Sequence, residues 1–245
     1  MTVDSNTITR DSLFNGKLTI YQYKKGYRFS IDAVILANIT ECTRNDLIID
    51  LGTGCGIIPL ILAYRGKGRR IVGVEIQEDL AEIARKNVEE NGFDSIIDIH
   101  RVDVRKIKDH FEAGTFDLVV SNPPYRPVKT GRINPESQKA IARHELTMTL
   151  EDTLSAAAYL LKNSGTLSMI YPAWRLDDLI VLAHQYNLRA KKLTCIHSQP
   201  GTNAELVHIV MRKKVGRELI IAPPLFVYES GEKRYTPQVE KFYEP

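Results

Sequence analysis

A short turn, Asn122-Pro123-Pro124-Tyr125, carries the residues in this sequence that are best suited to chemistry. It follows an apolar, β-branched run over residues 116–120, so we expect it at the carboxyl end of a β-strand. The two prolines fix φ at about −65° and lack an N–H group, so they end the hydrogen bonding of that strand. Asn122 adds a side-chain carbonyl, Pro123 a main-chain carbonyl and Tyr125 a flat ring. Two acceptors beside a ring predict a site for a planar amine, although a proline-rich turn with a solvent-facing tyrosine would have the same sequence.

A glycine-rich motif, Gly52-Thr53-Gly54-Cys55-Gly56, lies between a predicted strand over residues 46–51 and a predicted helix over 57–64. Glycines let the backbone approach a ligand closely, and the start of a helix offers unpaired N–H groups. The spacing differs from the G-x-G-x-x-G motif of dinucleotide sites, and Asp50 at the strand end would repel a pyrophosphate but could bind an ammonium group. The motif therefore favours a zwitterionic amino acid that carries a nucleoside over a diphosphate.

Acidic residues also end the next two predicted strands. Glu75 ends the strand over residues 70–75, where an acidic side chain can accept hydrogen bonds from ribose hydroxyls. Asp103 follows the strand over 96–102 and could accept from an adenine amino group. Because the carboxyl ends of parallel strands open on one edge of a sheet, we expect these two carboxylates to converge with Asp50 and Asn122.

The elements that must position these residues alternate between strand and helix, as in an α/β fold whose parallel sheet is covered by helices on both faces. Further helices are predicted over residues 29–37 with Ser30 as N-cap, 77–91, 104–111, 149–161 and 173–186. Further strands are predicted over 165–171, 189–197 and 205–213, the last two antiparallel. A polar loop over 126–145 interrupts the pattern and is long enough to be functional. Trp174 is expected to pack on the sheet.

The two ends of the chain flank one main domain over residues 30–215. Residues 13–30 predict a β-hairpin around Asn15-Gly16, so residues 1–29 form an amino-terminal extension. Residues 216–245 are expected to form an extended tail packed on the domain.

Composition excludes some protein classes and leaves others open. The 245 residues are 43% hydrophobic and 26% charged, as in an ordinary globular protein, and the net charge of +3 neither establishes nor excludes a nucleic-acid partner. Cys42, Cys55 and Cys195 show no CxxC spacing, so we expect no disulfide framework and no metal site. No signal peptide or long apolar run is present, which predicts a soluble cytoplasmic protein without a membrane partner.

The motif over residues 50–56, followed by Asn122-Pro123-Pro124-Tyr125, resembles the S-adenosylmethionine-dependent amino-methyltransferases over roughly residues 30–215. Residues 28–33, the triplet over 143–145 and the tail over 223–228 are similar to the bacterial tRNA(Val) adenine N6-methyltransferase family. The resemblance implies a Rossmann-like class I methyltransferase fold, with a mostly parallel seven-stranded sheet whose last strand runs antiparallel.

The same resemblance implies S-adenosylmethionine as cofactor and methylation of an adenine N6 in RNA, with a tRNA anticodon loop as the expected substrate. Catalysis is assigned to Asn122, Pro123 and Tyr125. Cofactor binding is assigned to Phe29, Asp32, Asp50, Gly52, Thr53, Gly54, Gly56, Glu75, Ile76, Asp103, Val104 and Asn122. Substrate binding is assigned to Pro124, Tyr125, Lys129, Arg132, Arg143 and His144. The alternatives are methylation of a protein glutamine amide, of guanine N2 or of adenine in DNA, and an RNA-binding protein on an inactive methyltransferase fold.

Overall fold

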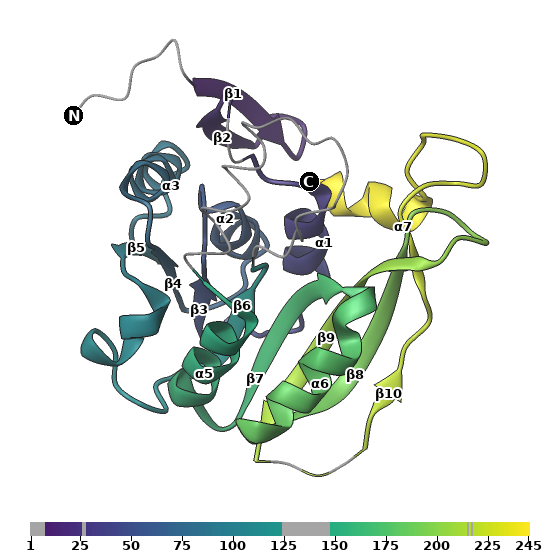
Figure 1. Ribbon diagram of the computed structural model, residues 1–245. Helices are drawn as coiled ribbons and strands as arrows, with labels where there is room; N and C mark the ends of the chain where they lie inside the picture. The colour runs from purple at the N-terminus through teal and green to yellow at the C-terminus, as the bar shows by residue number, and fades with distance from the viewer. Residues whose placement is uncertain (1–7, 26–27, 124–147, 215, 217) are drawn as a thin grey trace.

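A computed structural model of the chain describes residues 8–25, 28–123, 148–214, 216 and 218–245. Its centre is a twisted sheet with the strand order β10-β8-β9-β7-β6-β3-β4-β5 (Figure 1). The main strands are β3 (Leu47–Leu51), β4 (Arg70–Glu75), β5 (Ile97–Arg101), β6 (Phe116–Ser121), β7 (Leu161–Pro172), β8 (Leu188–His197) and β9 (Ala204–Lys213). The five strands from β5 to β7 pair in parallel, and β9 runs antiparallel between β7 and β8. The predicted α/β fold, mostly parallel with an antiparallel last strand, is confirmed.

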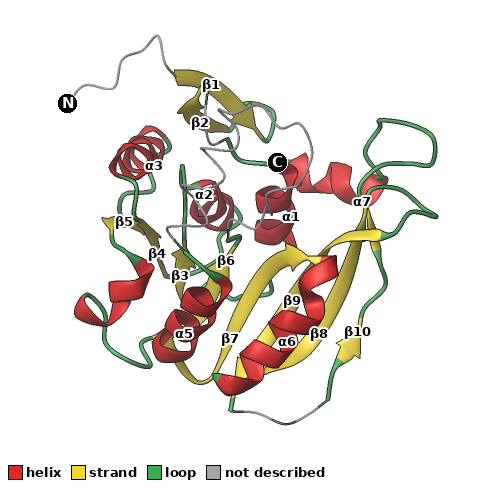
Figure 2. Ribbon diagram, in the orientation of Figure 1, coloured by secondary structure: helices red, strands yellow, loops and turns green. Residues whose placement is uncertain are grey.

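Helices cover both faces of this sheet, as the alternation of strand and helix predicts (Figure 2). One face carries α1 (Ile31–Ile39), α2 (Ile57–Tyr64) and α3 (Glu78–Glu90), and the other carries α5 (Leu150–Leu160), α6 (Leu176–Gln185) and the 3₁₀ helix η1 (Val104–Asp109). The strands are buried on both sides, so their apolar side chains divide between two hydrophobic cores. Ile48 contributes to the first core and Ile49 to the second, as the two-residue period of a strand requires.

Three predicted details differ from the structure. The helix expected over 104–111 is η1, in which Lys106 has the non-helical angles φ −107° and ψ 18°. The helix expected over 173–186 begins with a separate 3₁₀ turn, η2 (Ala173–Arg175), before α6 starts. Trp174 lies in this turn and is 63% exposed, so the expectation that it packs on the sheet is wrong.

The amino-terminal hairpin consists of β1 (Ile8–Leu13) and β2 (Leu18–Tyr23), so its first strand begins earlier than the sequence pattern suggested. Three consecutive residues of its turn, Phe14, Asn15 and Gly16, have positive φ, which explains the Asn-Gly pair. The Phe14 ring is buried and stacks on Tyr64 of α2, with the ring centroids 4.4 Å apart. The hairpin therefore belongs to the same core as α1, α2 and α3.

The carboxyl-terminal segment adds two short strands to the sheet edge, β10 (Ile220–Ile221) and β11 (Leu225–Phe226), both parallel to β8. It ends in α7 (Pro237–Glu240) and the 3₁₀ helix η3 (Lys241–Tyr243), which lie beside α1 (Figure 1). The Arg65 guanidinium donates to the Glu244 carbonyl at 2.7 Å, joining this end to the end of α2. None of the helices in the described ranges has the length and apolar character needed to cross a membrane.

Candidate active site

The carboxyl ends of three neighbouring strands bring the predicted site residues to one edge of the sheet. In β3, Leu51 is level with Val74 of β4 on one side and with Ser121 of β6 on the other. The next residues along these strands are Gly52, Glu75 and Asn122. The predicted convergence of the glycine-rich loop, the acidic strand end and the Asn-Pro turn is therefore a consequence of the strand order.

Asp50 lies one residue before the end of β3 and points to the same face as Ile48, towards the core that contains α1 and α2. Its side chain is completely buried, and neither carboxylate oxygen has a hydrogen-bond partner among the described residues. Burial raises the pKa of Asp50 to about 7, to which the charge of Glu75 contributes, while the nearby Thr53 hydroxyl partly opposes the shift. A buried acid without a partner is costly for folding, which makes Asp50 a candidate for binding a ligand.

Replacing Asp50 with asparagine should therefore stabilise the ligand-free protein at neutral pH. The Asp50 carboxyl has an ordinary pKa near 3.8 in the unfolded protein and a pKa of about 7 in the folded protein. The free energy of unfolding therefore decreases as pH rises between these two values. Asparagine has the same shape and no charge to bury, and we expect a gain of at least about 1 kcal/mol at pH 8. Urea unfolding at pH 5 and pH 8 measures this gain. A gain that does not increase with pH would contradict the assigned cause.

The glycine-rich loop leaves the end of β3 with a backbone that only glycine adopts easily. Gly52, Gly54 and Gly56 have φ angles of 76°, 58° and 82°. The N–H groups of Gly52 and Thr53 both donate to the Val74 carbonyl at 3.0 Å, which fixes the loop to β4. A Cβ atom at Gly52 would lie 3.0 Å from the end of the flexible Met148 side chain, so the requirement for glycine here comes from the positive φ angle. The buried Thr53 hydroxyl has no hydrogen-bond partner in the described structure.

Glu75, at the end of β4, holds this loop from the other side. Its carboxylate accepts a hydrogen bond from the Gly54 N–H at 3.0 Å and one from the Gln77 N–H at 2.9 Å. Each carboxylate oxygen retains a lone pair that can accept from a further donor. Glu75 therefore supports the loop and can still bind a pair of hydroxyl groups, a combination that the sequence did not reveal.

Asn122 follows β6 and presents a buried side-chain oxygen that accepts no hydrogen bond within the described ranges. The preceding Ser121 is different, because its hydroxyl donates to the Leu51 carbonyl at 2.9 Å and so joins β6 to β3. Pro123 is buried beside Asn122. The turn thus begins with one residue that stabilises the sheet and one whose side-chain oxygen has no partner among the described residues.

Asp103 lies at the end of β5, but its carboxylate is already paired. The Arg105 guanidinium donates to both of its oxygens, at 2.9 Å and 2.7 Å, and the Arg105 N–H donates to it at 3.0 Å. These hydrogen bonds to Arg105 hold the pKa of Asp103 below its ordinary value. A contact with an adenine amino group remains a prediction, and it would have to share the carboxylate with Arg105.

The other assigned residues lie at different distances from this centre. Phe29 is half-buried just before α1, Asp32 lies in the first turn of α1, and Ile76 directly follows Glu75. Val104 is buried in the second core, at the start of η1. The assigned substrate residues Pro124, Tyr125, Lys129, Arg132, Arg143 and His144 lie outside the described residues, so their roles stay predictions. Met148, which contacts the glycine-rich loop, was not predicted because nothing in the local sequence points to that contact.

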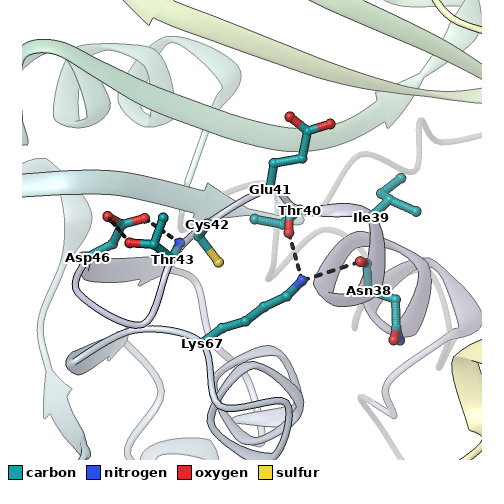
Figure 3. A pocket seen from close by; sticks show the side chains of 8 residues that line it. All are labelled: Asn38, Ile39, Thr40, Glu41, Cys42, Thr43, Asp46 and Lys67. Atoms are coloured by element: carbon teal, nitrogen blue, oxygen red, sulfur yellow. Dashed lines mark hydrogen bonds between the residues drawn. The ribbon is translucent and has the colours of Figure 1, made fainter.

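A surface pocket occurs at the opposite edge of the sheet, where the chain enters β3 and β4 (Figure 3). The Lys67 ammonium donates to the Thr40 carbonyl at 2.8 Å, and Asp46 accepts from the N–H and hydroxyl of Thr43. Lys67 and Asp46 are therefore used to connect the backbone segments of the pocket itself, and the third charged group, Glu41, pairs with Lys192 of β8 at 2.7 Å. The buried acceptors that have no partner in the described part of the chain lie at the other edge, where the predicted site residues converge.

The matches to known proteins agree with this geometry. The family model named Methyltransferase small domain matches residues 30–173. A predicted O-methyltransferase from Agrobacterium tumefaciens superposes with a TM-score of 0.69 at 23% identity, covering 86% of this chain and 95% of its own. A Thermus thermophilus 16S rRNA N2 G1207 methyltransferase, solved with AdoMet and guanosine, superposes with a TM-score of 0.60 at 17% identity, covering 84% of this chain and 50% of its own. The fold and the site define an α/β methyltransferase.

Curated relatives narrow this class. A tRNA1(Val) (adenine(37)-N6)-methyltransferase from Phocaeicola vulgatus is 32% identical over 206 residues, which cover 83% of this chain and 85% of the relative. Proteins of the same name from Bacteroides thetaiotaomicron and Dyadobacter fermentans are 30% and 26% identical, over 76% and 91% of this chain. The chain belongs to the tRNA1(Val) (adenine(37)-N6)-methyltransferase family, as the similarity over residues 28–33, 143–145 and 223–228 implied.

Proposed function

We propose that this enzyme transfers the methyl group of S-adenosylmethionine to the N6 atom of an adenine in the anticodon loop of a tRNA. The observation that carries the proposal is the set of buried acceptors without partners in the described structure, on Asp50, Thr53 and Asn122, at one edge of the sheet. The names of the relatives support adenine 37 of tRNA1(Val) as the target. A tRNA substrate also agrees with a cytoplasmic location.

The residues at the strand ends fit the proposed cofactor part by part. Asp50 offers an anionic partner for its ammonium group, and the free lone pairs of Glu75 suit two ribose hydroxyls. The positive φ angles at Gly52 and Gly54 let the backbone approach closely. When bound, S-adenosylmethionine supplies an electrophilic methyl group on a sulfonium.

Asn122 and Pro123 act on the amine that receives the methyl group. The lone pair of an adenine N6 is delocalised into the ring, so this nitrogen is a poor nucleophile while it is planar. Hydrogen bonds from the amine to Asn122 Oδ1 and the Pro123 carbonyl favour a more tetrahedral nitrogen, a change that grows towards the transition state. Alignment of the amine with the methyl group can contribute about 7–11 kcal/mol in favourable cases. The methylated amine is a strong acid and loses its proton without a dedicated base.

The substrate side of the proposal involves residues outside the described ranges. Tyr125 would stack on an adenine turned out of its neighbours, which is least costly in a single-stranded loop. Lys129, Arg132 and Arg143 would bind phosphates, and His144 would contact the RNA nearby.

Cofactor affinity should increase with pH if Asp50 binds the ammonium group. The raised pKa of Asp50, about 7, means that its carboxyl is mostly protonated at pH 6 and mostly ionised at pH 8. An ammonium ligand selects the ionised form, so we expect S-adenosylhomocysteine to bind roughly tenfold more tightly at pH 8. Calorimetry at both pH values measures the change. Asp50→Asn should bind weakly with no pH dependence, and an unaltered dependence in this variant would place the ammonium elsewhere.

Transfer of labelled methyl groups separates RNA from protein substrates. The same acceptors, on Asn122 and Pro123, would serve the planar amide of a glutamine side chain. We therefore expect tritium from labelled S-adenosylmethionine to enter total tRNA and not a protein extract from the same cells. Label found only in protein would overturn the proposed substrate.

A further inference from the structure

Two asparagines, Asn87 in α3 and Asn91 at the C-cap of the same helix, hold the amino-terminal hairpin. Asn87 Oδ1 accepts from the Tyr21 N–H at 2.6 Å, and its Nδ2 donates to the Tyr21 carbonyl at 2.9 Å. One turn later, Asn91 repeats the pattern with Thr19, at 2.9 Å and 2.8 Å. Each side-chain amide thus pairs with β2 as a neighbouring strand would, and satisfies backbone groups at its edge.

Of these two asparagines, Asn87 alone also bonds to the glycine-rich loop. Its Nδ2 donates a second hydrogen bond to the Cys55 carbonyl at 2.9 Å, whereas the second bond of Asn91 returns to the Asn87 carbonyl of its own helix. Asn87 is completely buried, and both protons of its amide are used. A change at Asn87 would therefore leave a loop carbonyl and a strand carbonyl without this donor in a buried place.

The hairpin is also hydrogen-bonded to residues 28 and 29, which lead into α1. The buried Gln22 of β2 accepts from the Phe29 N–H at 3.2 Å and donates to Asp11 at 2.7 Å. The Arg28 guanidinium donates to the Tyr23 carbonyl at 2.9 Å and to Asp11 at 3.0 Å. The hairpin is thus linked to the glycine-rich loop through Asn87 and bonded directly to the segment that leads into α1.

We propose that Asn87 is a positioning residue of the cofactor site, which couples the docking of the hairpin to the shape of the glycine-rich loop. The loop is held by side chains on both sides of Gly54-Cys55, because Glu75 accepts from the Gly54 N–H and Asn87 donates to the Cys55 carbonyl. Loss of the second hydrogen bond leaves three positive-φ glycines less constrained, so that cofactor binding must order them. This inference rests on the proposed cofactor.

Asn87→Ala and Asn91→Ala form a matched pair that tests this role. Both variants remove an amide that pairs with β2, but only the first removes a bond to the loop. Calorimetry with S-adenosylhomocysteine should show affinity reduced at least about fivefold in Asn87→Ala and less than about twofold in Asn91→Ala, on the scale of one buried hydrogen bond. At saturating cofactor, both variants should keep a kcat near that of the unmodified enzyme. Equal affinities in the two variants would overturn the proposal.

Hydrogen exchange in the unmodified enzyme tests the same role without a variant, so it can be used even if Asn87→Ala does not fold. Binding of S-adenosylhomocysteine should slow exchange of the Tyr21 amide, which Asn87 holds, more than that of the Thr19 amide, which Asn91 holds. Equal protection of the two amides would contradict the coupling. Calorimetry with S-adenosylhomocysteine on the unmodified enzyme separates the proposed cofactor from the proposed role of Asn87. If the unmodified enzyme does not bind this ligand, the proposed cofactor is refuted and the role of Asn87 is not.

Discussion

Asn122→Ala should lower the rate of methyl transfer at least about tenfold while the affinity for S-adenosylhomocysteine stays within about twofold. The reason is that Asn122 Oδ1 is buried, accepts no hydrogen bond from a described residue, and is proposed to accept one from the amine that receives the methyl group. Its removal takes away one of two acceptors that favour the tetrahedral nitrogen, an interaction that is strongest in the transition state. Single-turnover kinetics with saturating cofactor would report this step directly.

Ser121→Ala is the matched control for Asn122. Its hydroxyl donates to the Leu51 carbonyl within the sheet, so the variant should lose about 1 kcal/mol of stability without a comparable loss of rate. If both variants slow the reaction equally, the effect of Asn122 is a distortion of the turn. If Asn122→Ala reacts at the unmodified rate, its assigned role is wrong.

Glu75→Ala should have the largest effect on cofactor binding, weakening it by at least about tenfold. The carboxylate is expected to accept from two ribose hydroxyls, and each hydrogen bond to a charged group contributes about 1.5–3 kcal/mol. The substitution also leaves the N–H groups of Gly54 and Gln77 without their acceptor, which loosens the glycine-rich loop. Calorimetry with S-adenosylhomocysteine measures the combined loss.

Two further variants separate the contributions at Glu75. Glu75→Gln keeps the shape and one carbonyl acceptor, so its affinity should fall between those of the alanine variant and the unmodified enzyme. Glu78→Ala removes a nearby exposed carboxylate that pairs with Arg101, and it should leave cofactor affinity within about twofold. An unaltered affinity in Glu75→Ala would move the ribose contact to another residue.

The parts of this site that follow from strand order could be predicted from sequence. Asp50, Glu75 and Asn122 each end or follow an apolar run, and parallel strands bring their carboxyl ends together whatever the details of packing. The glycine-rich loop was predictable for the same reason, because Gly52 and Gly54 lie directly after such a run. The periodicity of apolar residues and the residue types at strand ends are local features of the sequence, so they predict positions in the folded protein without knowledge of distant contacts.

The parts that depend on contacts between distant segments could not be predicted. Asn87 bonds to residues 32 and 66 positions away. Its spacing from Leu80 and Ala84 puts it on the buried face of α3, but the helix pattern does not reveal which backbone groups it meets there. The pairing of Asp103 with Arg105 is, by contrast, a local contact between residues two positions apart, and the expectation that a strand-end carboxylate faces a ligand does not account for it. Trp174 was placed on the sheet by its apolar character alone, whereas η2 turns it outwards.

Mass spectrometry of nucleosides from unmodified tRNA1(Val), incubated with the enzyme and S-adenosylmethionine, tests the central claim most directly. The account predicts N6-methyladenosine at position 37, formed by the unmodified enzyme and strongly reduced with Asn122→Ala. Methylation of a guanine in the tRNA would contradict the account. So would an enzyme that binds S-adenosylhomocysteine and methylates glutamine in protein but leaves the tRNA unmethylated.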